Sequence, residues 1–112
     1  MILVTGGCGY IGSHVVKALT EAGEKVLAYD NLSQGTQAAL LHAEELVVGD
    51  ICDQESLKQV LETHDIEAVI HLAALVNAAE SNDKAELYRS VNEIGSQNVY
   101  QAAVAAGVKI IM

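Results

Sequence analysis

The sequence contains no phenylalanine and no tryptophan, and only two of its 112 residues are cysteines. A core without these large aromatic side chains must be built from aliphatic residues, and apolar residues make up 51% of the chain. Cys8 and Cys52 have neither the spacing of metal ligands nor the further cysteines of a disulfide framework. We therefore expect an aliphatic core, no metal site, and a reduced protein in the cytoplasm.

Positive charge is also scarce, with 6 Lys and Arg against 15 Asp and Glu and a net charge of −9. Surfaces for nucleic acid or anionic membranes need clustered Lys and Arg, so we expect neither partner. No apolar run approaches the roughly 20 residues of a membrane span. Met1 leads directly into an apolar run without a basic region or cleavage site, so we expect no signal peptide.

Apolar runs alternate with segments of helical spacing along the whole chain. The expected strands are residues 2–5, 25–29, 45–48, 68–72 and 108–111. The expected helices are residues 11–22, 53–61 and 83–106, with one loose helical turn within 37–43. Asp53 is the expected N-cap of the second helix, and Asp83 with Glu86 forms a capping-box-like pair at the start of the third. Apolar positions predict that Ile11, Val15, Ala18, Leu19 and Ala22 form the inner face of the first helix.

This alternation predicts an α/β fold with a parallel sheet covered by helices on both faces. Right-handed crossovers then give a doubly wound, Rossmann-type sheet in the strand order 3-2-1-4-5. Ligands bind such sheets at the carboxyl ends of the strands, between strands 1 and 4. We interpret residues 1–112 as one incomplete dinucleotide-binding domain, truncated at the fifth strand and lacking a substrate domain.

Three glycines follow the first strand, in a pattern that opens the first helix. Gly6 allows a tight turn out of the strand, Gly9 allows backbone N–H groups to approach a pyrophosphate, and Gly12 allows the helix to press against the sheet. The helix N-terminus adds unpaired N–H groups and about half a positive charge. The pattern predicts a dinucleotide-binding loop; the alternative is a glycine-rich turn that binds nothing.

The residues next to these glycines also have expected positions relative to the ligand and the core. Tyr10 and Ile11 begin the helix beside the expected pyrophosphate, with Ile11 in the core and Tyr10 facing either ligand or solvent. Cys8 lies near the phosphates without a base partner, so we interpret it as a small filler.

Asp30 ends the second strand, at about the spacing from the glycines where a carboxylate accepts hydrogen bonds from the adenosine ribose. The same carboxylate repels a 2′-phosphate by roughly 3 kcal/mol at about 5 Å and an effective dielectric near 20. Residues 26–57 contain no Lys or Arg to offset this. We therefore expect NAD rather than NADP; the alternative is a solvated loop aspartate.

Further candidate cofactor-binding residues lie at the ends of the third and fourth strands. Asp50 is placed to bind the adenine amino group and Ile51 to cover the ring, unless Asp50 only helps Asp53 to cap the next helix. Ala73 and Ala74 are small where the chain passes the ribose and phosphates, unless they are simply packing residues. His71 lies inside a buried strand, which favours a satisfied core histidine over a base.

Four segments, T-G-G-C-G-Y-I-G-S-H at 5–14, D-N-L-S at 30–33, G-D-I at 49–51 and H-L-A-A-L at 71–75, together resemble one family over the whole chain. It is the extended short-chain dehydrogenase/reductase family, and within it the NAD-dependent nucleotide-sugar epimerases of the UDP-glucose 4-epimerase type. The resemblance implies tightly bound NAD, a UDP-sugar substrate in a full-length form, and inversion at C4 through a 4-keto sugar. It also places Asn31, Leu32, Ser33, Leu72 and Asn92 among the cofactor-binding residues.

The chain departs from this family where catalysis is concerned. The family uses a Ser or Thr with a Tyr-x-x-x-Lys pair, and no tyrosine here has a Lys four residues later. We therefore assign no catalytic residue and expect no activity from this chain alone. Four positions carry a residue other than the family's usual Lys, Pro, Asn or Thr: Val76, Ala85, Val91 and Ser96.

Two other functions remain open, a stand-alone NAD-binding or NAD-sensing module and a non-catalytic Rossmann scaffold. The resemblance further implies a homodimer through the 83–106 helix. The expected inner face of this helix is Leu87, Val91, Gly95, Asn98, Val99, Ala102 and Ala106. Glu93, Gln97, Tyr100 and Val104 form a stripe roughly opposite that face. Scattered exposed apolar residues are the alternative explanation of this stripe.

Overall fold

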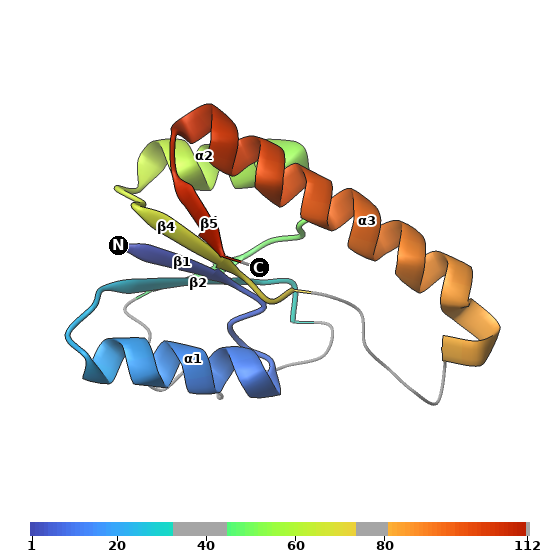
Figure 1. The fold of residues 1–112 in the computed structure, drawn as a ribbon, viewed down its shortest axis with the longest axis horizontal. Coiled ribbons are helices and arrows are strands. Elements are labelled where there is room, and N and C mark those ends of the chain that lie inside the picture. The colour runs from blue at the N-terminus through green and yellow to red at the C-terminus, as the bar shows by residue number, and fades with distance from the viewer. Residues whose placement is uncertain (33–44, 74–80, 112) are drawn as a thin grey trace.

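The computed structural model describes residues 1–32, 45–73 and 81–111, and Figure 1 shows their arrangement. The elements in chain order are β1 (Ile2–Thr5), α1 (Tyr10–Glu21), β2 (Val26–Asp30), β3 (Glu45–Val48), α2 (Gln54–Thr63), β4 (Ala68–His71), α3 (Ser81–Ala106) and β5 (Lys109–Ile111). All five expected strands and all three expected helices are confirmed. The loose turn expected within 37–43 lies outside the described residues.

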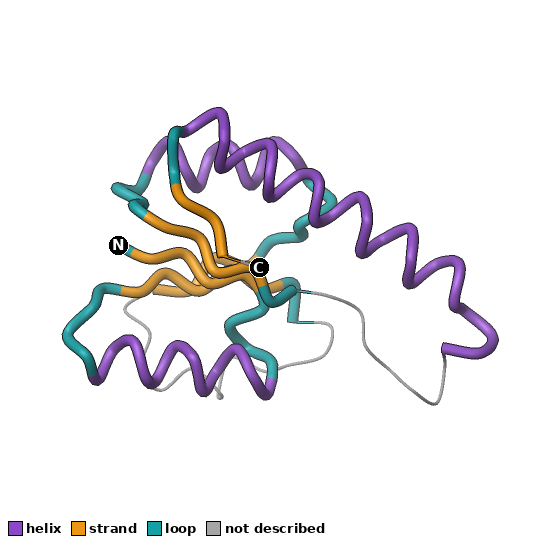
Figure 2. The backbone as a smooth tube through the Cα atoms, viewed as in Figure 1, coloured by secondary structure: helices purple, strands orange, loops and turns teal. Residues whose placement is uncertain are grey.

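The five strands form one parallel sheet in the order β3-β2-β1-β4-β5. The central strand β1 pairs with both neighbours, so that Thr5 lies opposite Tyr29 on one side and His71 on the other. Figure 2 shows α1 on one face of the sheet and α2 with α3 on the other. This is the doubly wound Rossmann-type sheet that the sequence predicts, and it brings the carboxyl ends of β1, β2, β3 and β4 to one edge.

The core consists of two aliphatic layers, because successive strand residues point to opposite faces of the sheet. One layer lies under α1 and contains Val4, Val16 and Val26, with Ile2, Leu19, Ile70 and Leu72 packed against them. The other lies under α2 and α3 and contains Leu3, Leu27, Tyr29, Ile51, Leu57, Val60, Ile66, Val69, Val99 and Ala103. Tyr29 is the one aromatic side chain in these two layers.

The inner face of α1 differs from the expected one. Gly12 and Val16 are the buried residues of the helix, whereas Ile11 is 64% exposed and Ala18 and Ala22 are exposed as well. The reason is Gly12, since a Cβ there would overlap the Gly6 carbonyl oxygen. This close approach turns the face that carries Gly12 towards the sheet and leaves Ile11 outside, so its expected core position is wrong.

Helix ends follow the predictions, apart from the start of α3. The Asp53 carboxylate accepts a hydrogen bond from the Ser56 N–H at 3.2 Å and caps α2, as expected. Gly23 and Gly107 follow α1 and α3 with φ of 89° and 71°, which suits glycine after a helix. The start of α3 is Ser81, however, so Asp83 does not occupy its N-cap position.

The packed face of α3 contains Gly95, Asn98 and Val99, which are buried as expected. Gly95 allows the helix to approach Ile51 closely, because a Cβ at Gly95 would overlap the Ile51 side chain. Ala106 is exposed, which contradicts its expected inner position. None of the helices in the described ranges is both long and apolar enough to cross a membrane.

We expect Gly12→Ala to lower the free energy of unfolding by about 1–3 kcal/mol, because the added methyl forces α1 away from the glycine loop. Denaturant unfolding of the purified chain measures this. The matched control is Gly9→Ala, whose Cβ would lie 3.4 Å from the Gly6 oxygen, an ordinary contact, and whose cost should stay below about 1 kcal/mol. Equal stability of the two variants would contradict the role given to Gly12.

Candidate dinucleotide-binding site

The glycine loop between β1 and α1 is pressed against the ends of the neighbouring strands. Gly6 has φ 72°, and a Cβ there would lie 2.8 Å from the backbone nitrogen of Ala73. The Gly6 N–H donates to the Tyr29 carbonyl at 2.7 Å, and the Gly9 N–H donates to the Gly6 carbonyl at 3.1 Å. Only glycine fits at position 6, so the turn that starts the loop is set by backbone contacts.

The N-terminus of α1 directly follows the glycine loop. Its N-cap is Gly9, no side chain caps it, and its first turn contains no acidic residue. The first N–H groups of a helix have no partner within it, so the positive end of α1 is not compensated by its own side chains. Among the described residues, apart from its chain neighbours, only the Gly6 oxygen lies within 4 Å of a Cβ placed on Gly9, and Tyr10 is 82% exposed. A pyrophosphate fits this cradle, whereas a larger side chain at Gly9 would occupy it.

Asp30 connects the glycine loop to the end of β2. Its carboxylate is buried and accepts two backbone hydrogen bonds, from the Cys8 N–H at 2.9 Å and from the Leu32 N–H at 2.8 Å. Leu32 has φ 64°, which turns the chain back towards the carboxylate. Each oxygen keeps further acceptor capacity for a ribose hydroxyl. Asp30 is therefore fixed beside the loop and is not a solvated loop residue.

The Cys8 thiol is buried and protonated at neutral pH. Its side chain is buried, and burial together with the nearby Asp30 charge raises its pKa to about 11. A thiol with this pKa stays protonated and is a poor nucleophile. The interpretation of Cys8 as a small filler is confirmed.

Asp50 and Ile51 follow β3 but have different surroundings. Asp50 is exposed, and its carboxylate accepts a hydrogen bond from the Cys52 N–H at 2.9 Å, whereas Asp53 alone supplies the cap of α2. Ile51 is 7% exposed and its side chain contacts Gly95 in the core. Its side chain therefore packs under α3 and does not lie open as a cover over a ring.

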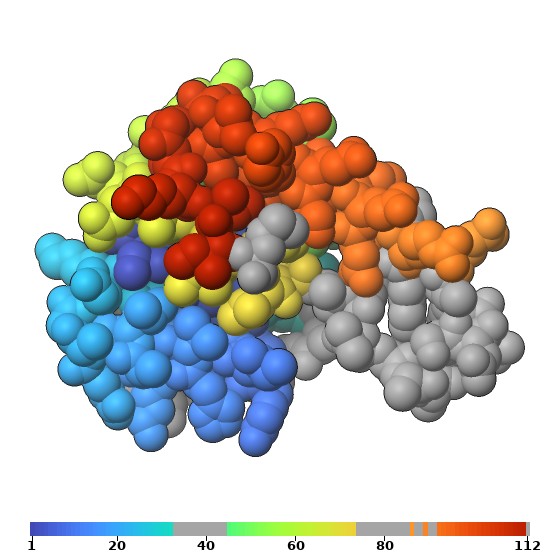
Figure 3. All heavy atoms as spheres, in the orientation of Figure 1, coloured from blue at the N-terminus to red at the C-terminus, as the bar shows by residue number. Residues whose placement is uncertain are grey.

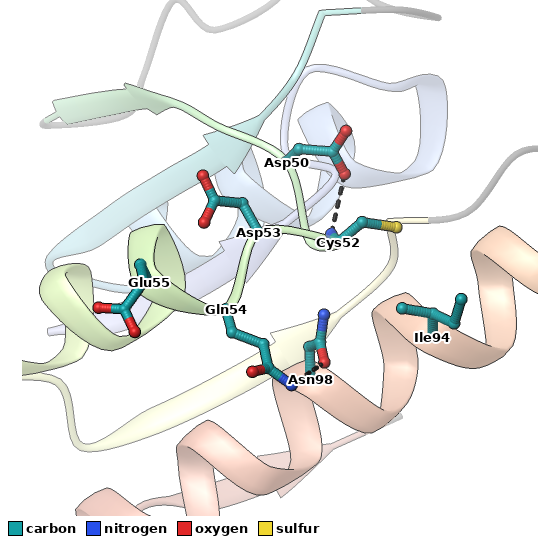
Figure 4. Close-up of a pocket in the computed structure, with 7 residues that line it drawn as sticks. All are labelled: Asp50, Cys52, Asp53, Gln54, Glu55, Ile94 and Asn98. Atoms are coloured by element: carbon teal, nitrogen blue, oxygen red, sulfur yellow. Dashed lines mark hydrogen bonds between the residues drawn. The ribbon is translucent and has the colours of Figure 1, made fainter.

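A pocket of about 570 Å³ lies beside Asp50, between the start of α2 and α3. Figure 4 shows the seven residues that line it: Asp50, Cys52, Asp53, Gln54, Glu55, Ile94 and Asn98. The Gln54 amide donates to Asn98 across the pocket at 2.9 Å. Although three carboxylates are present, no group of three or more His, Cys, Asp or Glu in the described part of the chain is arranged to hold a metal ion.

His71 belongs to a buried hydrogen-bond network around Thr5. The Thr5 hydroxyl oxygen accepts from the backbone N–H groups of Leu72 and Ala73 at 3.0 and 3.2 Å. It must therefore donate its own proton to His71 Nδ1, 2.7 Å away, and the ring then donates from Nε2 to the Ser96 hydroxyl at 3.0 Å. Burial lowers the pKa of His71. The ring is neutral with both nitrogens satisfied, which confirms the core interpretation.

The remaining predicted residues are placed as follows. Leu72 and Ala73 are half-buried after β4, and Ala73 contacts the Gly6 turn. Asn31 is exposed next to Asp30, and Asn92 is half-buried on α3. Ser33 and Ala74 lie outside the described residues. Sequence reasoning missed the hydrogen-bonding roles of Thr5, Tyr29, Ser96 and Asn98, since hydroxyl and amide groups within regular elements carry no spacing signal.

Comparison with known proteins decides the family. Residues 2–112 match the model of the NAD dependent epimerase/dehydratase family. The chain belongs to this family. UDP-glucose 4-epimerase of Azospirillum brasilense is 42% identical over 96% of this chain but only 31% of its own length. The chain thus spans about a third of the length of this curated epimerase.

Solved structures of the epimerase/dehydratase family share the fold. UDP-glucose 4-epimerase of Thermotoga maritima, solved with UDP-glucose, superposes with a TM-score of 0.89 at 38% identity, covering 96% of this chain and 35% of the other. UDP-glucose 4-epimerase of Brucella ovis, solved with NAD, superposes with a TM-score of 0.90 at 37% identity. The match covers 97% of this chain and 34% of the other. The family is NAD-dependent, and the cradle at Gly9 fits the pyrophosphate of that cofactor.

The lowered pKa of His71 predicts a loss of stability in acid. Above its ordinary pKa of 6.5 the ring is neutral in both states, whereas at lower pH the unfolded chain binds a proton that the folded chain does not. We expect the free energy of unfolding to fall from about pH 7.5 to about pH 5 more steeply in the wild type than in His71→Asn, whose side chain does not titrate. Urea titrations at each pH measure both curves, and parallel curves would refute this assignment.

Proposed function

We propose that this chain is the NAD-binding portion of a nucleotide-sugar epimerase of the UDP-glucose 4-epimerase type. The observation that carries the proposal is the open glycine loop before α1, with the Asp30 carboxylate hydrogen-bonded to the Cys8 N–H of that loop. A phosphate cradle next to a fixed carboxylate is the arrangement that a dinucleotide needs. The epimerases that the chain resembles support the substrate class.

Each end of the cofactor has a candidate place in this arrangement. The N–H groups at Tyr10, Ile11 and Gly12 face the pyrophosphate, the Asp30 carboxylate accepts from the adenosine ribose, and Asp50 faces the adenine amino group. The pocket beside Asp50 gives room on that side. Asn31, Leu32, Ser33, Leu72, Ala73, Ala74 and Asn92 complete the proposed contacts.

The proposed chemistry is inversion at C4 of a UDP-sugar through a 4-keto intermediate. NAD, when bound, supplies the hydride acceptor for this reaction. Removal of the hydroxyl proton needs a positioned base with a pKa near neutral. The buried His71 cannot serve, because Thr5 and Ser96 occupy both its ring nitrogens. No catalytic base is therefore proposed among the described residues.

The surroundings of the cysteines support a reducing compartment. Both Cys8 and Cys52 are free thiols in the structure, as is usual for proteins kept in the cytoplasm. We therefore place the proposed function there.

NAD should bind more tightly than NADP by at least about tenfold, because Asp30 repels a 2′-phosphate. Asp30→Ala should weaken NAD binding and narrow this difference. Isothermal titration of the purified chain with both cofactors measures the two dissociation constants. Equal affinities, or tighter binding of NADP, would remove the role of Asp30.

Gly9→Val is the control that separates cofactor binding from folding. The valine side chain enters the phosphate cradle and should abolish binding of both cofactors. The backbone of Gly9 has φ −76° and ψ 175°, which valine adopts readily. Retained NAD affinity in this variant would place the pyrophosphate elsewhere.

We also propose weak self-association through the outer face of α3. Glu93, Gln97, Tyr100 and Val104 are all exposed there, and Tyr100 and Val104 are both more than half exposed. Figure 3 shows α3, in orange and red, at the surface of the molecule. Sedimentation velocity should show a dimer fraction that grows with concentration and that Val104→Glu removes. A purely monomeric profile at high concentration would end this proposal.

A further inference from the structure

Tyr29 places a buried phenol directly under the turn that carries Asp50. Its side chain is fully buried, with 0% exposure, in the layer under α2 and α3. The phenol oxygen lies 2.8 Å from the Asp50 carbonyl oxygen and 2.9 Å from the Ser56 hydroxyl. A carbonyl can only accept, so the phenol donates to Asp50 and the Ser56 hydroxyl donates to the phenol. One hydroxyl of β2 thus holds the turn before α2.

The same turn is held from α3. The buried amide of Asn98 donates to the Ile51 carbonyl at 3.0 Å, so two successive carbonyls of the turn accept from side chains of other elements. The Asp50 carboxylate is in turn bound to the Cys52 N–H, within the same turn. The direction of that carboxylate therefore depends on where the turn backbone is held.

The phenol also fills the space next to the turn. A Cβ on Gly49 would lie 2.6 Å from the Tyr29 oxygen and 2.8 Å from the Ser56 hydroxyl. Burial, the largest influence, raises the pKa of Tyr29, so the phenol keeps its donor proton at neutral pH. The contact is a persistent one, and it cannot slip without moving Gly49 and Asp50 together.

We propose that Tyr29 is a positioning residue for recognition of the adenine ring of NAD. Its phenol fixes the Asp50 turn so that the carboxylate accepts a hydrogen bond from the adenine amino group. The inference rests on the proposed function, which places Asp50 beside that group. Tyr29 touches no ligand itself, and it acts through a carbonyl. Recognition sites need their groups held within about 0.5 Å of the productive geometry.

The test compares NAD with nicotinamide hypoxanthine dinucleotide, in which an oxygen replaces the adenine amino group. That oxygen cannot donate to a carboxylate, so the wild-type chain should bind NAD at least about tenfold more tightly. Tyr29→Phe, which removes only the hydroxyl, should lower this ratio by about threefold or more. The ratio of the two affinities separates a positioning role of Tyr29 from a purely structural one, because a general loss of stability weakens the binding of both dinucleotides equally.

Ser56→Ala is the matched control. It removes the other partner of the phenol and leaves the bond to Asp50 in place, so the ratio should stay within about twofold of the wild type. If Tyr29→Phe does not fold, Gly49→Ala tests the same contact by forcing the phenol and the turn apart, and it should lower the ratio in the same way.

A double-mutant cycle tests whether Tyr29 acts through Asp50. In an Asp50→Ala background, Tyr29→Phe should leave the ratio unchanged. A wild-type ratio in Tyr29→Phe, or a further fall in the Asp50→Ala background, would overturn the proposal. NAD binding without any preference over the analogue would overturn it while the proposed function stands. A complete lack of NAD binding would overturn the proposed function and this inference with it.

Discussion

The backbone of Gly6 contacts two other segments at distances that no side chain would permit. A Cβ on Gly6 would lie 2.8 Å from the backbone nitrogen of Ala73, just after β4, and a Cβ on Gly12 would overlap the Gly6 carbonyl oxygen. Because α1 and the segment after β4 both pack against Gly6, the position of Gly6 determines how closely the helix approaches the sheet. The open cradle at Gly9 exists only while these contacts hold. The geometry of this edge of the sheet thus depends on backbone packing around Gly6, and its side chains are positioned by that backbone.

Two buried polar groups tie the neighbouring strands to that frame. On one side, Asp30 accepts from the Cys8 N–H and holds the end of β2 to the loop. On the other, the Thr5 hydroxyl accepts from Leu72 and Ala73 and holds the end of β4. Every buried polar side-chain atom of the described residues has a hydrogen-bond partner. This matters because an unsatisfied buried group costs about 1–3 kcal/mol.

The fold and the glycine loop were predictable, since each depends on a local rule. Buried parallel strands appear as short continuous apolar runs, and Gly6 and Gly12 stand where no Cβ fits. The rotation of α1 was not predictable in the same way, because its apolar residues allow more than one inner face and the approach at Gly12 decides between them. Nor does any spacing reveal that the phenol of Tyr29 meets the carbonyl of Asp50, 21 residues away. Such contacts depend on tertiary packing, which periodicity does not contain.

The scarcity of aromatic residues gives this domain a simple optical character. With no tryptophan in the chain, its near-ultraviolet signal comes from four tyrosines. Tyr29 is fully buried and hydrogen-bonded in the core, while Tyr10 stands 82% exposed at the mouth of the glycine loop. The two rings therefore sense different events. The absorbance and circular dichroism of Tyr29 follow loss of the core, whereas the signal of Tyr10 follows the solvent environment at the start of α1.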